Sequence, residues 1–276
     1  MPKNNLRVIN LHRILCGDAR KEEDWEKLFG NIKANLIFTS APYADKRRKF
    51  YGGVRPDDYI EWFAPVALNI KNHLAEDGSF LLNIKEGVYQ GRRHLFVHKL
   101  LIYLVEKIGF EFIDELIWKK PPIPGRFPNR FKDGFERIFH LAKSVRPKFH
   151  PERVRIISRR AFRYGDVTRA RKAGQGTLIE GKFSQGLALP SNVLAFNTNG
   201  EKLSHPAVFP VALAEFFIEA FSDKGDIICD PFLGSGTTLI AAQKLDRRCF
   251  GMEIKKEHVD LAVKRLKGEG AKKAVN

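Results

Sequence analysis

Short apolar runs alternate with longer amphipathic segments along most of this chain. Runs of about four to eight apolar residues predict strands, whereas apolar residues recurring every three or four positions predict helices. This alternation predicts a doubly wound α/β fold, in which helices cover both faces of a mostly parallel sheet. The expected strands are Arg7–Leu15, Ala34–Ser40, Ser79–Lys85, Phe112–Trp118, Arg137–Ala142, Asp226–Asp230 and Cys249–Ile254. The expected helices are Trp25–Phe29, Asp57–Leu74, His94–Ile108, Ala207–Phe221, Thr237–Leu245 and Lys256–Leu266.

Glycines and one irregular segment divide this pattern. Helix ends or turns are expected at Gly30, Gly78, Gly109 and Gly225, because glycine commonly ends a helix in a left-handed conformation. The segment from Pro147 to Pro190 is rich in Arg and Gly and lacks long apolar runs, which indicates either a flexible loop region or a small insert that contacts a partner. The chain length of 276 residues therefore fits one large α/β domain, formed by 1–146 and 192–276, with an insert at 147–191.

The charge of the chain is strongly positive and unevenly distributed. The net charge is +16, and the segment from Lys119 to Lys182 contains 18 Lys and Arg against 5 Asp and Glu. Such a concentration indicates a polyanion partner, of which nucleic acid is the simplest.

Cysteine usage and hydropathy exclude several classes of protein. The three cysteines, Cys16, Cys229 and Cys249, lie in apolar runs without a Cys-x-x-Cys pattern, so core thiols are expected rather than a zinc site. No apolar run reaches the roughly 20 residues that span a bilayer, and Met1–Asn5 is polar, which predicts a cytoplasmic protein without a membrane partner. Few Met and Cys beside many charged residues are also typical of thermophilic proteins.

A glycine-rich turn near the C-terminus predicts a ligand pocket. The sequence Cys-Asp-Pro-Phe-Leu-Gly-Ser-Gly-Thr-Thr at 229–238 joins an apolar strand to a helix, and Glu253 lies near the end of the next apolar run. Glycines let backbone amides approach a ligand, a helix N-terminus favours negative charge, and a carboxylate about 20 residues further on accepts ribose hydroxyls. The pattern is that of a nucleotide-type pocket.

A second motif, Thr-Ser-Ala-Pro-Tyr at 39–43, follows an apolar strand near the N-terminus. Ligands of such sheets bind at the carboxyl ends of strands. A hydroxyl, a backbone carbonyl and an aromatic ring placed there could recognise a planar group that carries an amine. Alone, the same motif is also compatible with an ordinary strand-to-loop turn bearing an exposed Tyr.

Together, the two motifs resemble those of DNA amino-methyltransferases. The stretch 230–238 looks like their S-adenosylmethionine-binding motif, and 39–43 resembles their catalytic motif, which is usually Ser-Pro-Pro-Tyr, Asn-Pro-Pro-Tyr or Asp-Pro-Pro-Tyr. The order of catalytic motif, recognition region and cofactor motif is similar to that of the permuted beta group, which belongs to restriction-modification systems. Three further segments carry the resemblance: Cys16–Asp18, Asp57–Trp62 and Leu203–Pro210.

The resemblance assigns cofactor-binding roles to residues at the strand ends. It implies a Rossmann-like S-adenosylmethionine-dependent domain with a target-recognition insert, its catalytic half at 1–146 and its cofactor-binding half at 192–276. Glu253 would hold the ribose hydroxyls, Asp18 the adenine amine, and Asp230 would orient the loop or contact the cofactor amine. The remaining cofactor-binding residues implied are His205, Pro206, Phe209, Pro231, Phe232, Gly234, Ser235, Gly236, Thr237 and Thr238.

The resemblance also implies direct methyl transfer to the exocyclic amine of a base flipped out of duplex DNA. Ser40 and the main-chain carbonyl of Ala41 would accept hydrogen bonds from the amine, and Tyr43, which follows Pro42, would stack on the base. Alignment and electrostatic complementarity would supply the acceleration. Ser40 favours the N4 amine of cytosine, as in the Ser-Pro-Pro-Tyr subgroup, over the N6 amine of adenine.

Arginines and lysines near these motifs are the candidates for DNA contacts. Most contacts to duplex DNA go to phosphates rather than to base edges. A cognate restriction endonuclease, without a stable complex, is a further partner that the resemblance implies. The candidate DNA-binding residues are Lys46, Arg47, Arg48, Lys49, Arg153, Arg155, Arg159, Arg160, Arg163, Arg169 and Arg171.

Ala41 departs from the family pattern, which has Pro at this position. Alanine retains the carbonyl but loses the ring that fixes φ, although Pro42 still favours an extended residue 41. The residue is either a natural variant or an introduced change, and we expect reduced activity. Three rival functions stay open: adenine methylation, methylation of structured RNA, and DNA binding without catalysis.

Overall fold

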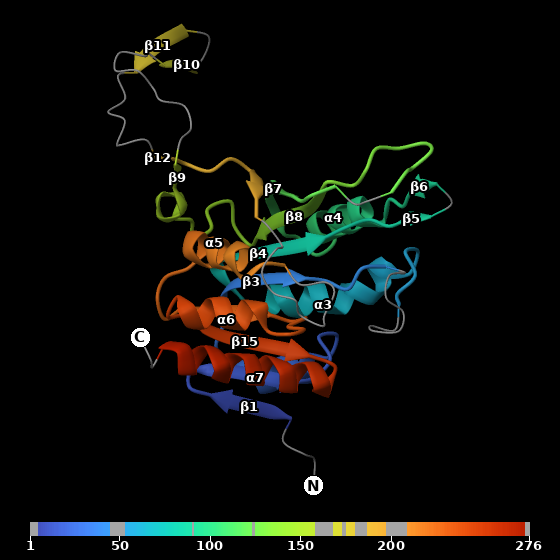
Figure 1. Ribbon diagram of the computed structural model, residues 1–276, viewed down its shortest axis with the longest axis vertical. Coiled ribbons are helices and arrows are strands. Elements are labelled where there is room, and N and C mark those ends of the chain that lie inside the picture. The colour runs from blue at the N-terminus through green and yellow to red at the C-terminus, as the bar shows by residue number, and fades with distance from the viewer. Residues whose placement is uncertain are drawn as a thin grey trace.

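The protein forms a doubly wound α/β domain, shown in Figure 1 as a computed structural model. The structure describes residues 5–44, 53–89, 91–122, 125–157, 168–172, 175–179, 187–196 and 209–273. Within these ranges nine strands form one sheet in the order β1-β2-β15-β14-β3-β4-β8-β7-β13. In this order the strands span Leu6–Ile9, His12–Cys16, Arg248–Glu253, Ile227–Asp230, Ala34–Ser40, Leu74–Ile84, Phe135–Ala142, Glu111–Lys119 and Val193–Ala195.

The pairing of these strands confirms the predicted mostly parallel sheet. Strands β2, β15, β14, β3 and β4 run parallel to one another, and β13 runs parallel to β7. The antiparallel pairs are β1 with β2, and β8 with both β4 and β7.

Helices cover both faces of the sheet (Figure 1). Helices α1 (Glu22–Phe29), α3 (Tyr59–His73) and α4 (Phe96–Glu106) contribute to one apolar cluster, which includes Trp25, Phe63 and Leu100. On the other face, Leu213, Leu239 and Val259 belong to a second cluster. That face is covered by α5 (Val211–Phe221), α6 (Thr237–Lys244) and α7 (Lys256–Lys273). Each helix thus buries an apolar side against the sheet.

The smaller elements lie outside the central sheet. Two short hairpins pair β5 (Val88–Tyr89) with β6 (Arg92–Arg93) and β10 (Thr168–Lys172) with β11 (Gln175–Ile179). A 3-10 helix, η1 (Pro151–Val154), precedes β9 (Ile156–Ile157), which pairs with β12 (Leu187–Ala188). In Figure 1 the β10–β11 hairpin lies at the end of the molecule opposite β1. No helix in the described part of the chain is both long and apolar enough to cross a membrane.

The chain turns in opposite directions after two neighbouring central strands. From β3 it passes through α3 to β4, and from β14 it passes through α6 to β15, on the other side of the β14–β3 pair. Ligands of open α/β sheets bind at the carboxyl ends of strands at such a switch point. Both motifs found in the sequence follow these two strands.

Two details of the predicted pattern were wrong. Arg7–Leu15 is not one strand but the hairpin of β1 and β2, which turns at Asn10, a residue that adopts φ of 53°; Asn tolerates this left-handed conformation better than most residues. Gly78 does not end a helix but lies inside β4, where an added Cβ would be 2.8 Å from Leu74 Cδ1 and 3.0 Å from the Asn35 carbonyl oxygen. Gly78 therefore permits close packing.

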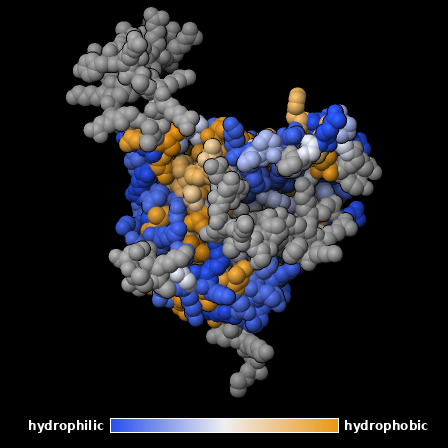
Figure 2. All heavy atoms as spheres, viewed as in Figure 1, coloured by the Kyte–Doolittle hydropathy of each residue, from blue (hydrophilic) through white to orange (hydrophobic). Residues whose placement is uncertain are grey.

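An apolar cavity of about 480 Å³ lies away from the switch point, between α5 and the strands β7, β8 and β13. Its lining includes Ile113, Phe149, Leu194 and Phe216. Hydrophobic side chains gather near α5 and β13 on the face shown in Figure 2, whereas hydrophilic side chains cover much of the remaining described surface.

Candidate active site

The glycine-rich turn connects β14 to α6 through a conformation that requires glycine. Gly234 and Gly236 adopt φ of 53° and 85°. An added Cβ at Gly236 would also lie 2.8 Å from the Cβ of Ala262 on α7. Both positions exclude most side chains for backbone reasons, and the second also for packing. The turn therefore leads tightly from β14 into the N-terminus of α6, where the sequence analysis expects a ligand pocket.

Asp230 holds this turn in place. Its Oδ1 accepts hydrogen bonds from Phe232 N at 3.1 Å and Thr39 Oγ1 at 2.6 Å, and its Oδ2 accepts one from Thr238 Oγ1 at 2.7 Å. Burial raises the pKa of the Asp230 carboxyl to about 6, although these hydrogen bonds act in the opposite direction. The contacts fit the first of its two expected roles, which is to orient the loop.

Glu253 lies at the end of β15 and contacts the same turn. Its Oε2 accepts a hydrogen bond from Gly234 N at 3.0 Å, and its Oε1 accepts one from Lys255 N at 2.9 Å. The side chain is 4% exposed. Because a carboxylate oxygen can accept a second hydrogen bond, Glu253 can position the glycine turn and still accept from a ligand hydroxyl.

Asp18 lies near Glu253 because β2 pairs with β15, with Cys16 opposite Glu253. The Asp18 carboxylate accepts hydrogen bonds from Arg20 Nε at 3.0 and 3.1 Å and from Arg20 Nη2 at 2.6 Å. This guanidinium lowers the pKa of the Asp18 carboxyl. A ligand amine at Asp18 would therefore share the carboxylate with Arg20, a contact that the sequence analysis missed.

Aromatic packing and one arginine complete the walls of the turn. Phe232 stacks on Trp62 of α3, with ring centroids 5.9 Å apart, and Phe209 packs against Phe38 at 4.7 Å. Arg265 of α7 donates to the carbonyl oxygen of Ser235 at 2.7 Å and to its hydroxyl at 3.0 Å. Sequence reasoning missed Arg265, since an arginine on a solvated helix carries no distinguishing signal.

Thr237 is the first residue of α6, and its buried hydroxyl has no hydrogen-bond partner among the described residues. A buried hydroxyl without a partner is costly, so this Oγ1 fits a site that receives a polar ligand group. Pro231 is buried beside Asp230 in the same turn. His205 and Pro206 lie outside the described residues.

The predicted catalytic motif begins where β3 ends. Ser40 is the last residue of β3 and lies opposite Asn83 of β4. Ala41 is 2% exposed and packs in the core cluster that includes Ala44. Tyr59, the first residue of α3, donates its hydroxyl to the Pro42 carbonyl oxygen at 2.7 Å. That hydrogen bond fixes the chain between Ser40 and Tyr43.

Tyr43 is bound through a buried carboxylate. Its hydroxyl donates to Glu136 Oε2 at 2.9 Å, and Lys120 Nζ donates to Glu136 Oε1 at 2.7 Å. Glu136 lies in β8 and is buried. The Lys120 ammonium also lies 4.2 Å from the centre of the Trp118 ring. Sequence reasoning assigned no role to Glu136 or Lys120.

The predicted DNA-contacting residues are only partly described. Arg169 and Arg171 occupy alternate positions on β10, and Arg155 is exposed just after η1. The other predicted contacts, apart from Arg153, lie outside the described residues: Lys46, Arg47, Arg48, Lys49, Arg159, Arg160 and Arg163.

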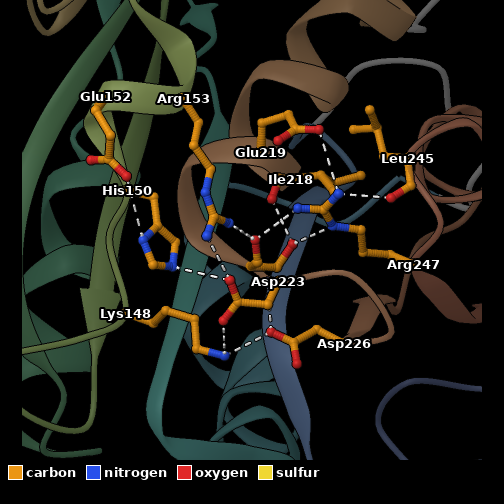
Figure 3. A network of polar contacts seen from close by, with 11 residues as sticks. Lys148, His150, Glu152, Arg153, Ile218, Glu219, Asp223, Asp226, Leu245 and Arg247 are labelled. Carbon is orange, nitrogen blue, oxygen red and sulfur yellow. Dashed lines mark hydrogen bonds and ion pairs between the residues drawn. The ribbon is translucent and has the colours of Figure 1, made fainter.

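Arg153 belongs to an ionic network that fixes the segment before β9 against the end of α5 (Figure 3). Its Nη2 donates to Asp223 Oδ1 at 2.9 Å and its Nη1 to the Ser222 carbonyl oxygen at 3.0 Å. Lys148 Nζ lies 3.0 Å from Asp223 Oδ2 and 2.8 Å from Asp226 Oδ2. Arg153 and Lys148 together lower the pKa of the Asp223 carboxyl to about 2. In this structure Arg153 is therefore bound within the fold, and the start of the predicted insert packs on the main domain.

The chain is similar to one family model and to a known protein of high sequence identity. Residues 34–264 match the family model N6_N4_Mtase, which is described as DNA methylase. The type II methyltransferase M.ScaI of Streptomyces caespitosus is 48% identical over 248 residues, covering 85% of this chain and 75% of that protein.

A second relative in sequence and two solved structures are also similar to this chain. The type II methyltransferase M.PvuII of Proteus hauseri is 28% identical over 263 residues, covering 84% of this chain and 77% of that protein. The structure of PvuII DNA methyltransferase (cytosine-N4-specific) has a TM-score of 0.70 at 24% identity, covering 94% of this chain and 87% of that one. TTHA0409 of Thermus thermophilus, in complex with S-adenosyl-L-methionine, has a TM-score of 0.59 at 24% identity, covering 92% of this chain and 93% of that one.

Proposed function

The chain belongs to the DNA methylase family whose model it matches over residues 34–264, and on this premise we propose that it transfers a methyl group from S-adenosylmethionine to the N4 amine of a cytosine in duplex DNA. The contact between Thr39 and Asp230 carries the proposal. It joins the strand that ends in Ser40 to the glycine turn that would hold the cofactor. A methyl donor and an acceptor base can therefore meet at one edge of the sheet.

The residues of the glycine turn fit this cofactor. Gly234 and Gly236 carry no side chain that would block a ligand, and the buried Thr237 hydroxyl can bond a polar ligand group. Glu253 retains acceptor capacity for hydroxyls of a ribose beside Gly234. When bound, S-adenosylmethionine supplies an electrophilic methyl group on a sulfonium. The glycine turn would position that methyl group and exclude water from it.

The catalytic motif would prepare the amine. An exocyclic amine is a poor nucleophile because its lone pair is delocalised into the ring. The Ser40 hydroxyl and the Ala41 carbonyl would accept hydrogen bonds from its two protons, which favours a pyramidal nitrogen with a directed lone pair. Since the Pro42 carbonyl is bonded to Tyr59, the preceding carbonyl of Ala41 is the suitable main-chain acceptor. Tyr43 would stack on the base.

Cytosine is the proposed target for two reasons. Ser40 stands where the subgroup with Ser-Pro-Pro-Tyr carries its serine. The relative M.PvuII, similar in sequence and fold, is described as cytosine-N4-specific in its structure.

The base must leave the duplex to reach the pocket, which costs a few kcal/mol that stacking and phosphate contacts offset.

The proposed biological setting follows from the relatives. Several are type II methyltransferases, so we infer a modification enzyme of the cytoplasm that protects DNA from a cognate endonuclease. Its basic segment would bind phosphates of the duplex. A thermophilic source stays a prediction from composition.

Methyl transfer to defined nucleic acids tests the proposal. The full chain is incubated with S-adenosylmethionine carrying a labelled methyl group and with unmethylated duplex DNA or RNA, and the product is digested to nucleosides. We expect labelled N4-methylcytosine from DNA, and its loss in Tyr43→Ala. N6-methyladenine would overturn the choice of base, and label in RNA alone the choice of substrate. The absence of any labelled product would overturn the proposed activity.

A further inference from the structure

Phe131 is an unusually exposed aromatic side chain. It is 95% exposed, whereas the next most exposed large hydrophobic residue in the described part of the chain, Val145, is 71% exposed. Full exposure forgoes the burial that normally stabilises an aromatic ring. Such a position therefore suggests a contact made with a partner.

The loop that carries Phe131 is held firmly. Asp133, which is buried, accepts hydrogen bonds from both Arg93 and Arg130. Lys120 N donates to the Gly134 carbonyl oxygen at 2.7 Å. Phe131 thus lies between Arg130 and Asp133, which are hydrogen-bonded to each other.

Further contacts fix the same loop from its other side. Asn129 Nδ2 donates to the Gly91 carbonyl oxygen at 2.9 Å, and the Arg130 guanidinium lies 3.9 Å from the centre of the Phe127 ring. Arg93 in turn donates to the buried Glu86 at 2.6 Å. These contacts hold the loop in place, and Phe131 is exposed to solvent at a fixed position on it.

This loop leads directly to the catalytic motif. Glu136, which binds the hydroxyl of Tyr43, follows Phe131 by five residues. Five residues span at most about 18 Å when fully extended. Since one turn of duplex DNA measures roughly 34 Å along its axis, Phe131 lies within about half a turn of the group that binds Tyr43.

The charge around Phe131 identifies the partner. The segment from Lys119 to Gly134 contains five cationic residues and a single acidic residue, Asp133, which is buried and paired. Two of the cations form ion pairs within the fold, Lys120 with Glu136 and Arg130 with Asp133. The other three are Lys119, Arg126 and Lys132. An exposed aromatic ring flanked by cations matches the surface of a duplex, which offers phosphates outside and stacked bases inside.

We propose that Phe131 is a wedge that enters the base stack of DNA while the neighbouring cations bind the phosphates. This inference rests on the proposed function, since it is the extrusion of a target base that leaves a gap for the ring. Apolar side chains inserted at a base step unstack it and stabilise the distorted duplex. The wedge lowers the cost of removing the base, and it touches neither the methyl donor nor the amine.

Two DNA duplexes distinguish a wedge at Phe131 from a residue that only supports DNA binding in general. One has the target base correctly paired, and the other has an abasic site opposite the target, so that extrusion is already cheap. The paired target site is first located by sequencing the methylated product. Phe131→Ala is compared with Phe131→Trp, which retains a stacking ring, and with Val145→Ala, an exposed apolar residue elsewhere.

Phe131→Ala should lower kcat/KM on the paired duplex at least tenfold and on the abasic duplex by no more than twofold. Phe131→Trp should retain most of the activity on both duplexes, and Val145→Ala all of it. An equal loss on the two duplexes, or no loss on either, would overturn the wedge.

Binding provides a readout that needs no turnover. With S-adenosylhomocysteine present, fluorescence anisotropy should show Phe131→Ala binding paired duplex at least fivefold more weakly than wild type. Wild-type protein that methylates no DNA would overturn the proposed function alone. Equal binding of duplex by wild type and Phe131→Ala would overturn the wedge alone, as would capture of a protein partner that loses affinity for Phe131→Ala while DNA binding is unchanged.

Discussion

Thr39 and Asp230 are 191 positions apart in the chain, yet the Thr39 hydroxyl donates to the Asp230 carboxylate across 2.6 Å. Thr39 directly precedes the serine of the catalytic motif, and Asp230 opens the glycine turn. Both residues are buried at the carboxyl ends of neighbouring parallel strands. One hydrogen bond therefore links the two halves of the proposed reaction centre.

Removing this link should weaken both halves. Thr39→Val keeps the shape of the side chain but leaves one oxygen of a buried carboxylate with one donor fewer, so the free energy of unfolding should fall by about 1–3 kcal/mol. Urea denaturation measures the loss, and KM for S-adenosylmethionine should rise with it. Thr39→Ser, which retains the hydroxyl, serves as the control. Equal stability of the Val and Ser variants would contradict the prediction.

The buried carboxyl of Asp230 should make stability depend on pH. Its folded pKa of about 6 exceeds the unfolded value of about 3.9, so the folded state binds the proton more tightly. The contribution of Asp230 to the free energy of unfolding is therefore fully present below about pH 4 and is lost as the pH rises from about 4 to 6. The change approaches about 3 kcal/mol at 1.36 kcal/mol per pKa unit.

Asp230→Asn tests that contribution because its amide oxygen can still accept from Thr39 and Phe232, while the lost acceptor for Thr238 lowers stability by an amount that does not vary with pH. The difference in unfolding free energy between the variant and wild type, measured at steps from pH 4 to 7, should shift in favour of the variant as the pH rises. A constant difference would show that Asp230 does not titrate in this window.

Glu253 should act on the cofactor through the glycine turn as well as directly. Glu253→Ala removes the acceptor for both Gly234 N and Lys255 N, whereas Glu253→Gln retains one acceptor oxygen. We expect a loss of affinity for S-adenosylmethionine of at least tenfold for Ala and a smaller loss for Gln. Isothermal titration calorimetry measures both, with the exposed Glu257→Ala as control. Unchanged affinity in Glu253→Ala would remove this residue from the site.

The sequence predicted the order of the main elements because apolar periodicity reflects burial. The glycine turn and the Ser-Ala-Pro-Tyr motif have local signatures, so the sequence also supplied the hypothesis of which strand ends carry chemistry, and that hypothesis stays a prediction. It could not predict partners fixed by the sheet. Glu136 resembles any polar residue in a strand, and only the placement of β8 beside β4 brings it to Tyr43. Arg153 illustrates the converse, because its positive charge indicated DNA while the fold pairs it with Asp223.

Replacing Ala41 with Pro should increase the rate of methyl transfer. Ala41→Pro would fix φ at the residue whose carbonyl is expected to accept the amine proton. Restricting one backbone position is worth about 0.4–1 kcal/mol, which corresponds to about a two- to fivefold faster methyl transfer if the gain is made at the transition state. Single-turnover kinetics measures it, with the unfolding free energy as a check that the buried ring is tolerated. Equal rates in a stable variant would refute the expected weakness at position 41.

Tyr43 and Glu136 should act as a unit. Tyr43→Phe keeps the stacking ring but loses the hydrogen bond to Glu136, and Glu136→Gln weakens the same bond from the other side. A hydrogen bond to a charged group contributes about 1.5–3 kcal/mol, so either change should lower kcat/KM about tenfold or more. The double variant should lose little beyond either single variant, because both remove one interaction. Tyr43→Ala should lose considerably more, since it also removes the ring. Additive losses in the double variant would mean that Glu136 serves Lys120 and the fold rather than the orientation of Tyr43.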